Sequence, residues 1–334
     1  MSFLHSLLPF EAIKRVAVTL GLFFRQHRAA AILTMASIAV VAYFYGFVPY
    51  FGAYHDYSAL GYLAGSWNER TGYDHGFVGP FLIAFLLLRR LPEVAEAPWR
   101  PAGWGIAFII FGVLTYLVAI RTLQYHVAVG GLPFLILGGI AWAHSWRAAR
   151  LLAFPIFVLY FLIPVPGLIQ ATNGLQLLAT KAAYSIATFA GIDAVLSGND
   201  INSVPAGKWG FNIAEGCSGV RSLVALTLIG AVYAHLTQRE LWKKLVIFAC
   251  SFPLAIIGNC LRVASILFVA EYISPDFASK SYHGGSGFIF FLVVGLAGLS
   301  LCDWLLNHAG RSRVVTRRVS TLQNASTPPA ESAS

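Results

Sequence analysis

Three polar residues in apolar surroundings are the candidates for chemistry in this sequence. Cys217 lies in a Gly-Cys-Ser-Gly stretch at the start of an apolar run, Arg262 lies inside the next run, and His283 directly precedes two glycines. A cysteine thiolate is a strong nucleophile, and histidine exchanges protons near neutral pH. Arginine stays protonated, so it suits the stabilisation of an oxyanion or a substrate carbonyl. Together these residues predict acyl transfer through a thioester.

The neighbours of Cys217 strengthen this interpretation. Arg221 follows four residues later, so on a helix it shares a face with Cys217. A nearby cation and a helix amino terminus both lower the pKa of a thiol and favour the thiolate. Further candidates for substrate binding or support lie next to the motifs, namely Glu215, Ser218 and Asn259.

Each of these residues also has a structural interpretation. Most buried cysteines are small inert side chains, and a disulfide between Cys217 and Cys260 would remove the nucleophile. Arg221 and Arg262 would serve structure by bonding carbonyl groups between helices, although an arginine in the middle of a span favours function. His283, beside two glycines, is equally compatible with a plain loop residue.

The other cysteines indicate packing rather than metal binding. Cys250, Cys260 and Cys302 are spread along apolar runs, without a C-x-x-C pair or the spacing of a zinc site. The sequence therefore predicts neither a metal ion nor another cofactor.

A second polar cluster, residues 67–76, precedes an apolar run and reads Trp-Asn-Glu-Arg-Thr-Gly-Tyr-Asp-His-Gly. Asp74 and His75 are candidates to orient His283 or to bind the substrate. An interfacial aromatic belt with a capped helix start explains the same residues equally well.

The composition indicates that membrane helices position these residues. The chain has 334 residues, of which 57% are hydrophobic and 11% charged, and its mean hydropathy is +0.70. Soluble domains carry about 25% charged residues. The net charge of +9 is scattered between apolar runs, which fits the loops of a polytopic membrane protein and argues against a nucleic-acid partner.

Hydropathy predicts an all-α bundle of about eight transmembrane helices. Most of the 23 Lys and Arg residues fall on one side of these spans, which predicts that both termini are cytoplasmic. Cys217, Arg262 and His283 then fall in the outer half of the membrane or at its surface, with Arg262 about 12 Å from the outer end of its span. The predicted spans lie near residues 29–51, 75–90, 103–120, 124–143, 150–169, 217–236, 245–270 and 284–306.

The segments outside the spans complete the predicted organisation. Residues 175–191 have apolar residues at helical spacing, which predicts an amphipathic helix at the outer membrane surface. Residues 195–214 combine turn residues with short alternating stretches, which predict a small hairpin before Cys217. The edge of such a hairpin would suit an extended peptide. The chain thus divides into a cytoplasmic or interfacial segment (1–28), a membrane domain (29–306) and a basic, disordered cytoplasmic tail (307–334).

Taken together, the motifs resemble the exosortase/archaeosortase family of multi-pass cysteine transpeptidases. The matching residues are 215–222, 259–263 and His283, and Asp74-His75-Gly76 ahead of a short span is similar to the amino-terminal half of exosortases. The resemblance covers most of residues 30–306. In the archaeal branch the third motif position looks like an arginine. The histidine at position 283 therefore places the chain with the bacterial members.

The resemblance implies a sorting enzyme of the bacterial cytoplasmic (inner) membrane with an outward-facing active site. Such enzymes recognise exported proteins that end in a short motif such as Pro-Glu-Pro, a transmembrane helix and a basic segment. They cut near the motif and pass the new carboxyl terminus to an acceptor, which the sequence leaves open between a surface glycan, a lipid and water. On this chain Cys217 would be the nucleophile, Arg262 the oxyanion or substrate stabiliser, and His283 the acid and base.

Two other functions are compatible with the residues. An intramembrane cysteine protease that only hydrolyses would use the same side chains and differ in the acceptor. A transporter or scaffold would instead line an anion path with Arg221 and Arg262, although the sequence shows no inverted repeat. A silent Cys217→Ser substitution would favour that last alternative.

Overall fold

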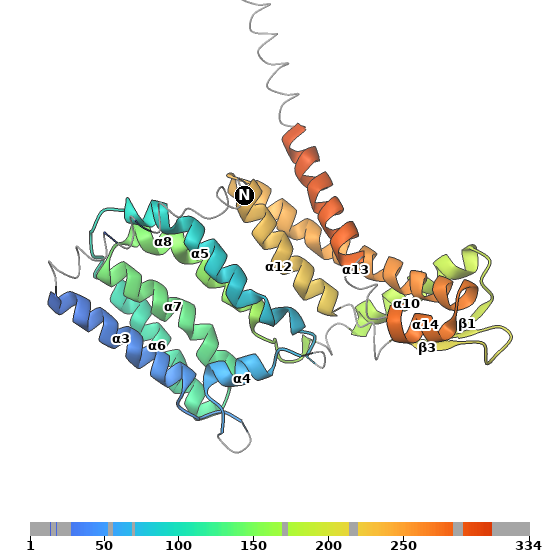
Figure 1. Ribbon diagram of the computed structural model, residues 1–334, viewed down its shortest axis with the longest axis horizontal. Coiled ribbons are helices and arrows are strands. Elements are labelled where there is room, and N and C mark those ends of the chain that lie inside the picture. The colour runs from blue at the N-terminus through green and yellow to red at the C-terminus, as the bar shows by residue number, and fades with distance from the viewer. Residues whose placement is uncertain are drawn as a thin grey trace, which may run out of the picture. The chain divides into compact units, whose positions relative to one another are not determined.

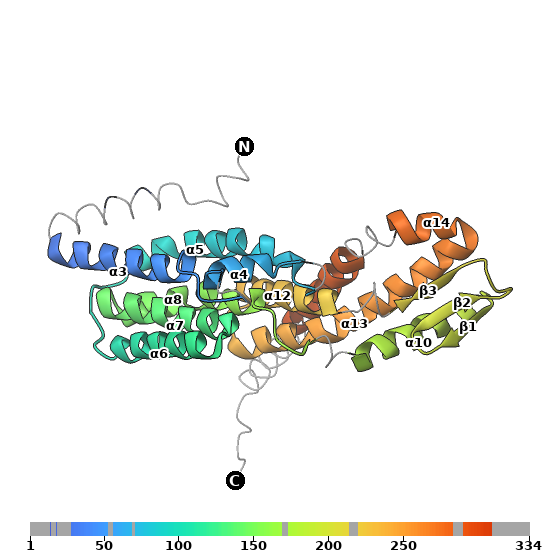
Figure 2. The same ribbon diagram turned by 90° about the horizontal axis from the view of Figure 1, so that it is seen from below.

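The computed structural model describes a mainly helical chain (Figures 1 and 2). It divides into two compact units, Met1–Leu168 and Ile169–Ser334. The described residues are 14, 18, 28–52, 56–68, 71–168, 173–213, 220–282 and 290–308. Outside them lie Glu215, Cys217, Ser218, His283, the Arg221 side chain and nearly all of the predicted terminal segments 1–28 and 307–334.

The first unit is a bundle of helices around α7 (Tyr125–Ala143). Its other elements are α3 (Arg28–Gly46), α4 (Ala59–Gly65), the 3-10 turn η1 (Asp74–Phe77), α5 (Gly79–Ala95), α6 (Gly105–Thr122), α8 (Trp146–Phe157) and the 3-10 turn η2 (Val158–Leu162). Helix α7 contacts α3, α4, α6 and α8. The core of this unit gathers aromatic and aliphatic side chains, among them Tyr45, Phe51, Tyr116 and Val129.

Glycines let α6 and α7 pack at short distance. A Cβ atom on Gly138 would lie 2.8 Å from both the Gly105 carbonyl oxygen and the Ile109 nitrogen. One on Gly112 would lie 2.9 Å from the Leu135 nitrogen. Backbone atoms cannot rotate away as a side chain can. In lipid, where helices gain little hydrophobic drive to associate, this close approach supplies the van der Waals contact that holds the pair together.

The Gly138→Ala variant is therefore expected to destabilise the first unit by about 1–3 kcal/mol, the range for overpacked cores. The matched control is Gly139→Ala, because a Cβ atom on Gly139 would have no heavy atom within 4 Å. Helix propensity makes that change neutral or stabilising by up to about 1 kcal/mol. Thermal unfolding in detergent, followed by circular dichroism, compares the variants. Equal melting temperatures would contradict the close packing of α6 and α7.

The second unit is organised on α13 (Leu241–Tyr272), which has 32 residues. At 1.5 Å per residue this helix is about 48 Å long, so it exceeds the hydrocarbon core of a bilayer, which is about 30 Å thick. The other elements are α10 (Asn173–Phe189), β1 (Ala194–Ser197), β2 (Asp200–Ser203), β3 (Gly210–Asn212), α12 (Val220–Thr237), α14 (Pro275–Phe277), and the π-helical turns η3 (Ala278–Tyr282) and η4 (Phe291–Gly295). An α-helix over residues 296–308 follows η4.

The three strands form an antiparallel sheet in the order β1-β2-β3. Ala194 pairs with Ser203, and Asp200 pairs with Asn212. Gly198 has a φ of +63° in the short turn between β1 and β2, a conformation that glycine adopts without strain. The predicted hairpin is therefore confirmed and extended by a third strand, and the predicted amphipathic helix corresponds to α10.

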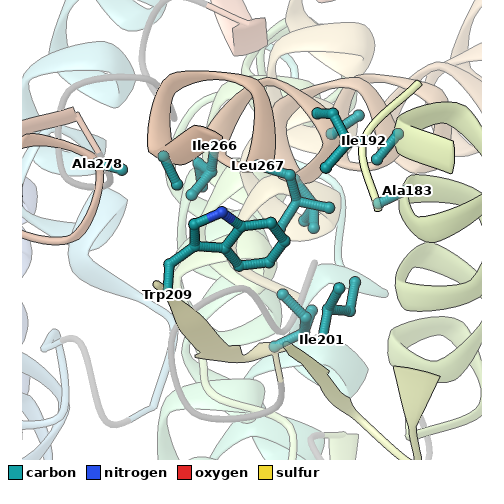
Figure 3. Packing of buried hydrophobic residues seen from close by; sticks show 12 residues of the cluster. Ala183, Ile192, Ile201, Trp209, Ile266, Leu267 and Ala278 are labelled. Carbon is teal, nitrogen blue, oxygen red and sulfur yellow. The ribbon is translucent and has the colours of Figure 1, made fainter. Parts of the chain in front are cut away.

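The sheet and α10 pack against the carboxyl-terminal half of α13. Figure 3 shows the Trp209 indole beside Ile201 of β2 and beside Ile266 and Leu267 of α13. A polar contact adds to this packing, because Trp209 Nε1 donates to Glu271 Oε2 at 2.7 Å. Lys208 donates to the Glu271 carbonyl oxygen at 3.2 Å and forms an ion pair with its carboxylate. The sheet is thus tied to the last turn of α13.

Helix α10 turns small side chains towards α13 and larger apolar ones outward. Ala183 and Ala187 are fully buried in the shared cluster. Leu178 and Phe189 are exposed. Small residues permit close contact with a neighbouring helix, and the outward apolar side chains suit a helix that lies at a membrane surface.

The helices fit a membrane environment. By length and composition, three of the described helices suffice to cross a membrane, namely α6, α7 and α13. Shorter apolar helices cover Thr34–Gly46 and Ser222–Thr237. Each of the eight predicted spans contains helix in its described part. The chain is a helical membrane protein, and the number of eight spans stays a prediction.

One predicted span differs from the structure. Residues 150–169 do not form one continuous helix, because α8 ends at Phe157 and continues only as the 3-10 turn η2. Pro155 lies inside α8, and Pro164 follows η2. Proline disfavours helical geometry in the residue before it, and Ile163, directly before Pro164, is extended with φ −89° and ψ 115°, so no helix continues through this point.

Candidate functional site

Two of the described residues of the predicted site lie on α13, in the second unit. Asn259 and Arg262 are three residues apart and share one face of this helix. Arg262 is only 8% exposed and Asn259 only 3%. Burying a guanidinium in wholly apolar surroundings is costly. Its burial beside an amide is therefore typical of a polar site within the protein rather than of a lipid-facing surface.

A pocket opens beside these two residues, where α12, α13 and the segment around η4 meet. Its polar lining residues are Ser222, Asn259 and Arg262. The remaining wall is apolar or glycine, contributed by Leu226, Leu254, Ala255, Gly258, Phe290 and Gly295. The pocket thus combines one guanidinium, one amide and one hydroxyl within apolar walls, which suits the binding of a carbonyl group and its developing negative charge.

The pocket wall is close in the chain to Cys217 and His283, the two predicted catalytic residues that lie outside the described ranges. Ser222 comes five residues after Cys217, and Phe290 comes seven residues after His283. A fully extended chain spans at most about 18 Å over five residues and about 25 Å over seven. Arg221, another candidate, belongs to the first turn of α12. Chain connectivity therefore permits Cys217 and His283 to reach the pocket.

The described cysteines carry free thiols. This holds for Cys250, Cys260 and Cys302. Cys260 is therefore not tied in the disulfide with Cys217 that would have removed the predicted nucleophile. Within the described ranges, no group of three His, Cys, Asp or Glu side chains is arranged to hold a metal ion.

In the first unit, Asp74 and His75 lie on η1 and precede α5, which begins at Gly79 instead of near the predicted residue 75. His75 Nε2 lies 3.2 Å from the Phe161 carbonyl oxygen. Burial lowers the pKa of His75, while the Phe161 carbonyl and Asp74 oppose this shift. The ring is therefore mainly neutral at pH 7, and as a neutral donor it bonds the carbonyl through Nε2–H.

Two aromatic residues of the same cluster bind the same stretch of backbone. Trp67 Nε1 donates to the Leu162 carbonyl oxygen at 2.9 Å, and Tyr73 Oη accepts from the Val165 nitrogen at 3.3 Å. The end of a helix leaves carbonyl groups without intrahelical partners, and this cluster supplies donors to them. The sequence was compatible with a structural interpretation of this cluster but did not predict its contacts with residues 161–165, around Pro164. A role of Asp74 or His75 towards the substrate stays a prediction.

These observations define the class of the protein, a helical membrane protein with a buried arginine in a small, largely apolar pocket. The sequence model of the transmembrane exosortase family (Exosortase_EpsH) matches residues 67–299. This range covers well over half of the chain and includes α12, α13 and the segments that carry Cys217 and His283, so the chain belongs to this family. Comparisons with curated proteins and with solved structures find no match.

Proposed function

We propose that the protein is a cysteine transpeptidase that removes a carboxyl-terminal sorting tag from exported proteins. The observation that carries the proposal is Arg262, a buried guanidinium in a pocket whose wall lies a few residues after Cys217 and His283 in the chain. Membership of the transmembrane exosortase family supports the same class of activity. The tag would consist of a short motif, a transmembrane helix and a basic end.

In the first half-reaction, His283 takes the proton of the Cys217 thiol, and the thiolate attacks the carbonyl carbon of the scissile peptide bond. The negative charge moves to the carbonyl oxygen, where the Arg262 guanidinium stabilises it by donating hydrogen bonds. The carbon–nitrogen bond then breaks, and the imidazolium of His283 gives its proton to the leaving amine. The products are a thioester on Cys217 and the released tag.

In the second half-reaction, an acceptor attacks the thioester carbon while His283 removes the acceptor's proton. The bond to the sulfur breaks, and Cys217 leaves as a thiolate. If the acceptor is water, the product ends in a free carboxylate. If it is a hydroxyl or amine of a surface glycan or lipid, the product is an ester or an amide.

The other predicted residues have supporting roles in this proposal. Arg221, four residues after Cys217 in the chain, would favour the thiolate by its charge. Asn259, on the same face of α13 as Arg262, would orient the substrate carbonyl. Glu215, Ser218, Asp74 and His75 stay candidates for binding or support. The loop charges favour a cytoplasmic position for both termini and an outward-facing site in the inner membrane.

The test is co-expression with a reporter that ends in a Pro-Glu-Pro motif, a transmembrane helix and a basic segment. Intact-mass analysis is expected to find a cleaved reporter with the wild type and an uncleaved one with Cys217→Ala. Cys260→Ala is the matched control and should retain cleavage, because this cysteine lies outside the pocket lining. Cleavage that survives Cys217→Ala would contradict the proposal. The mass of the reporter's new carboxyl end would identify water or another acceptor.

A further inference from the structure

Two hydrogen bonds connect the end of η3 to the backbone of Arg262. Tyr282 Oη donates to Ser265 Oγ at 3.0 Å, although the two residues are 17 positions apart. Ser265 Oγ donates in turn to the Arg262 carbonyl oxygen at 2.7 Å. A hydroxyl can donate one hydrogen bond and accept others at the same time, so the two bonds are compatible and form a continuous chain.

This chain of hydrogen bonds is of interest because of where Tyr282 lies in the sequence. Tyr282 is the residue directly before His283 in the sequence. Consecutive Cα atoms are only 3.8 Å apart, so fixing Tyr282 fixes the point from which the His283 backbone starts. Ser265 lies three residues after Arg262 and therefore on the same face of α13. The bond thus joins the segment that leads to His283 to the helix turn that carries Arg262.

The packing around η3 supports a fixed attachment. Ala278, the first residue of η3, is fully buried in the cluster that also contains Val263 and Leu267 of α13. The Tyr282 ring is partly buried and packs against the same cluster. A π-helical turn is a rare element that is frequently found at functional sites. A phenylalanine would provide the same ring, so the hydroxyl of Tyr282 is available for a task other than filling space.

We propose that Tyr282 and Ser265 are positioning residues that hold the His283 segment against the Arg262 end of α13. The inference rests on the proposed function, in which His283 and Arg262 act on the same carbonyl group. Acid–base groups must be held within about 0.5 Å of their productive geometry, and a misplacement of 1 Å costs about 10²-fold in rate. The hydroxyl chain would supply this precision without touching the substrate.

The test uses purified protein in detergent and the tagged reporter that the wild type cleaves. Tyr282→Phe and Ser265→Ala are each expected to lower kcat by about 10- to 100-fold while KM stays within about twofold, because the substrate contacts are unchanged. The double variant should have a kcat no lower than that of either single variant, since both changes break the same chain of hydrogen bonds. Ser265→Thr keeps a hydroxyl and should retain most of the activity.

The matched control is Tyr233→Phe. Tyr233 Oη also bonds side chains across two helices, at 3.3 Å from Asp303 Oδ2 and 3.5 Å from Ser300 Oγ, and it does not line the pocket. Its kcat should equal that of the wild type. A wild-type kcat in Tyr282→Phe, or multiplying losses in the double variant, would overturn the positioning role alone. Cleavage that persists in Cys217→Ala, assayed in parallel, would overturn the proposed function and the positioning role together.

Discussion

The Arg262→Lys variant is expected to cleave the tagged reporter about 10²- to 10³-fold more slowly than the wild type, the loss observed when one oxyanion donor is removed. Lysine keeps the positive charge but loses the planar guanidinium, whose several N–H groups point in fixed directions. Because Arg262 is only 8% exposed, water has little access to replace the missing donors. Cleavage rates of purified variants at saturating reporter measure the effect.

Arg239→Lys is the matched control for this prediction. Arg239 is exposed and lies between α12 and α13, away from the residues that line the pocket. Surface substitutions of this kind change free energies by about 0.5 kcal/mol or less, so the rate should stay within about twofold. A near-normal rate in Arg262→Lys would refute the oxyanion or substrate role. Loss of expression in that variant would point to a structural role instead.

The His283→Ala variant is expected to lose about 10²- to 10⁴-fold in cleavage rate, the usual contribution of a general acid and base. Intact-mass analysis of the chain then separates the two half-reactions. An adduct on Cys217 with the mass of the reporter minus its tag would show that attack succeeds and that resolution needs the imidazole. Slow cleavage without an adduct would show that formation of the thioester is the step that needs it.

A second histidine serves as the control for this variant. His308 is exposed and lies on the helix that follows η4, 25 positions after His283 in the chain. His308→Ala should cleave the reporter at the wild-type rate. A wild-type rate in His283→Ala would remove the acid–base assignment and leave His283 as a loop residue.

Much of the fold was predictable because its signals are local. Long apolar runs predicted α6, α7 and α13, and glycine and asparagine at the turn predicted the hairpin of β1 and β2. The break after α8 was missed, because the apolar run continues to Pro164 and beyond while α8 ends at Phe157. The contact of His75 with Phe161 was also missed, since residues 86 positions apart carry no local signal of their pairing.

The site was predictable only in part. An arginine inside an apolar run is conspicuous in a sequence, so Arg262 was predicted from its type alone, and the structure buries it in the pocket lining. Ser222 and Tyr282 are ordinary residues whose contacts depend on how each helix is rotated about its axis and which neighbours it meets. Hydropathy is nearly uniform around such membrane helices, so it does not report this rotation.

The unbroken course of α13 sets a fixed distance inside the second unit. Between Arg262 and Glu271 this helix contains neither glycine nor proline. Nine residues of α-helix place the pocket arginine about 13 Å along the axis from the turn to which Lys208 and Trp209 tie the sheet. An extended peptide covers that distance with about four residues. If the edge of the sheet holds an extended peptide, as the sequence predicts, this fixed spacing would determine which bond of that peptide lies at Arg262.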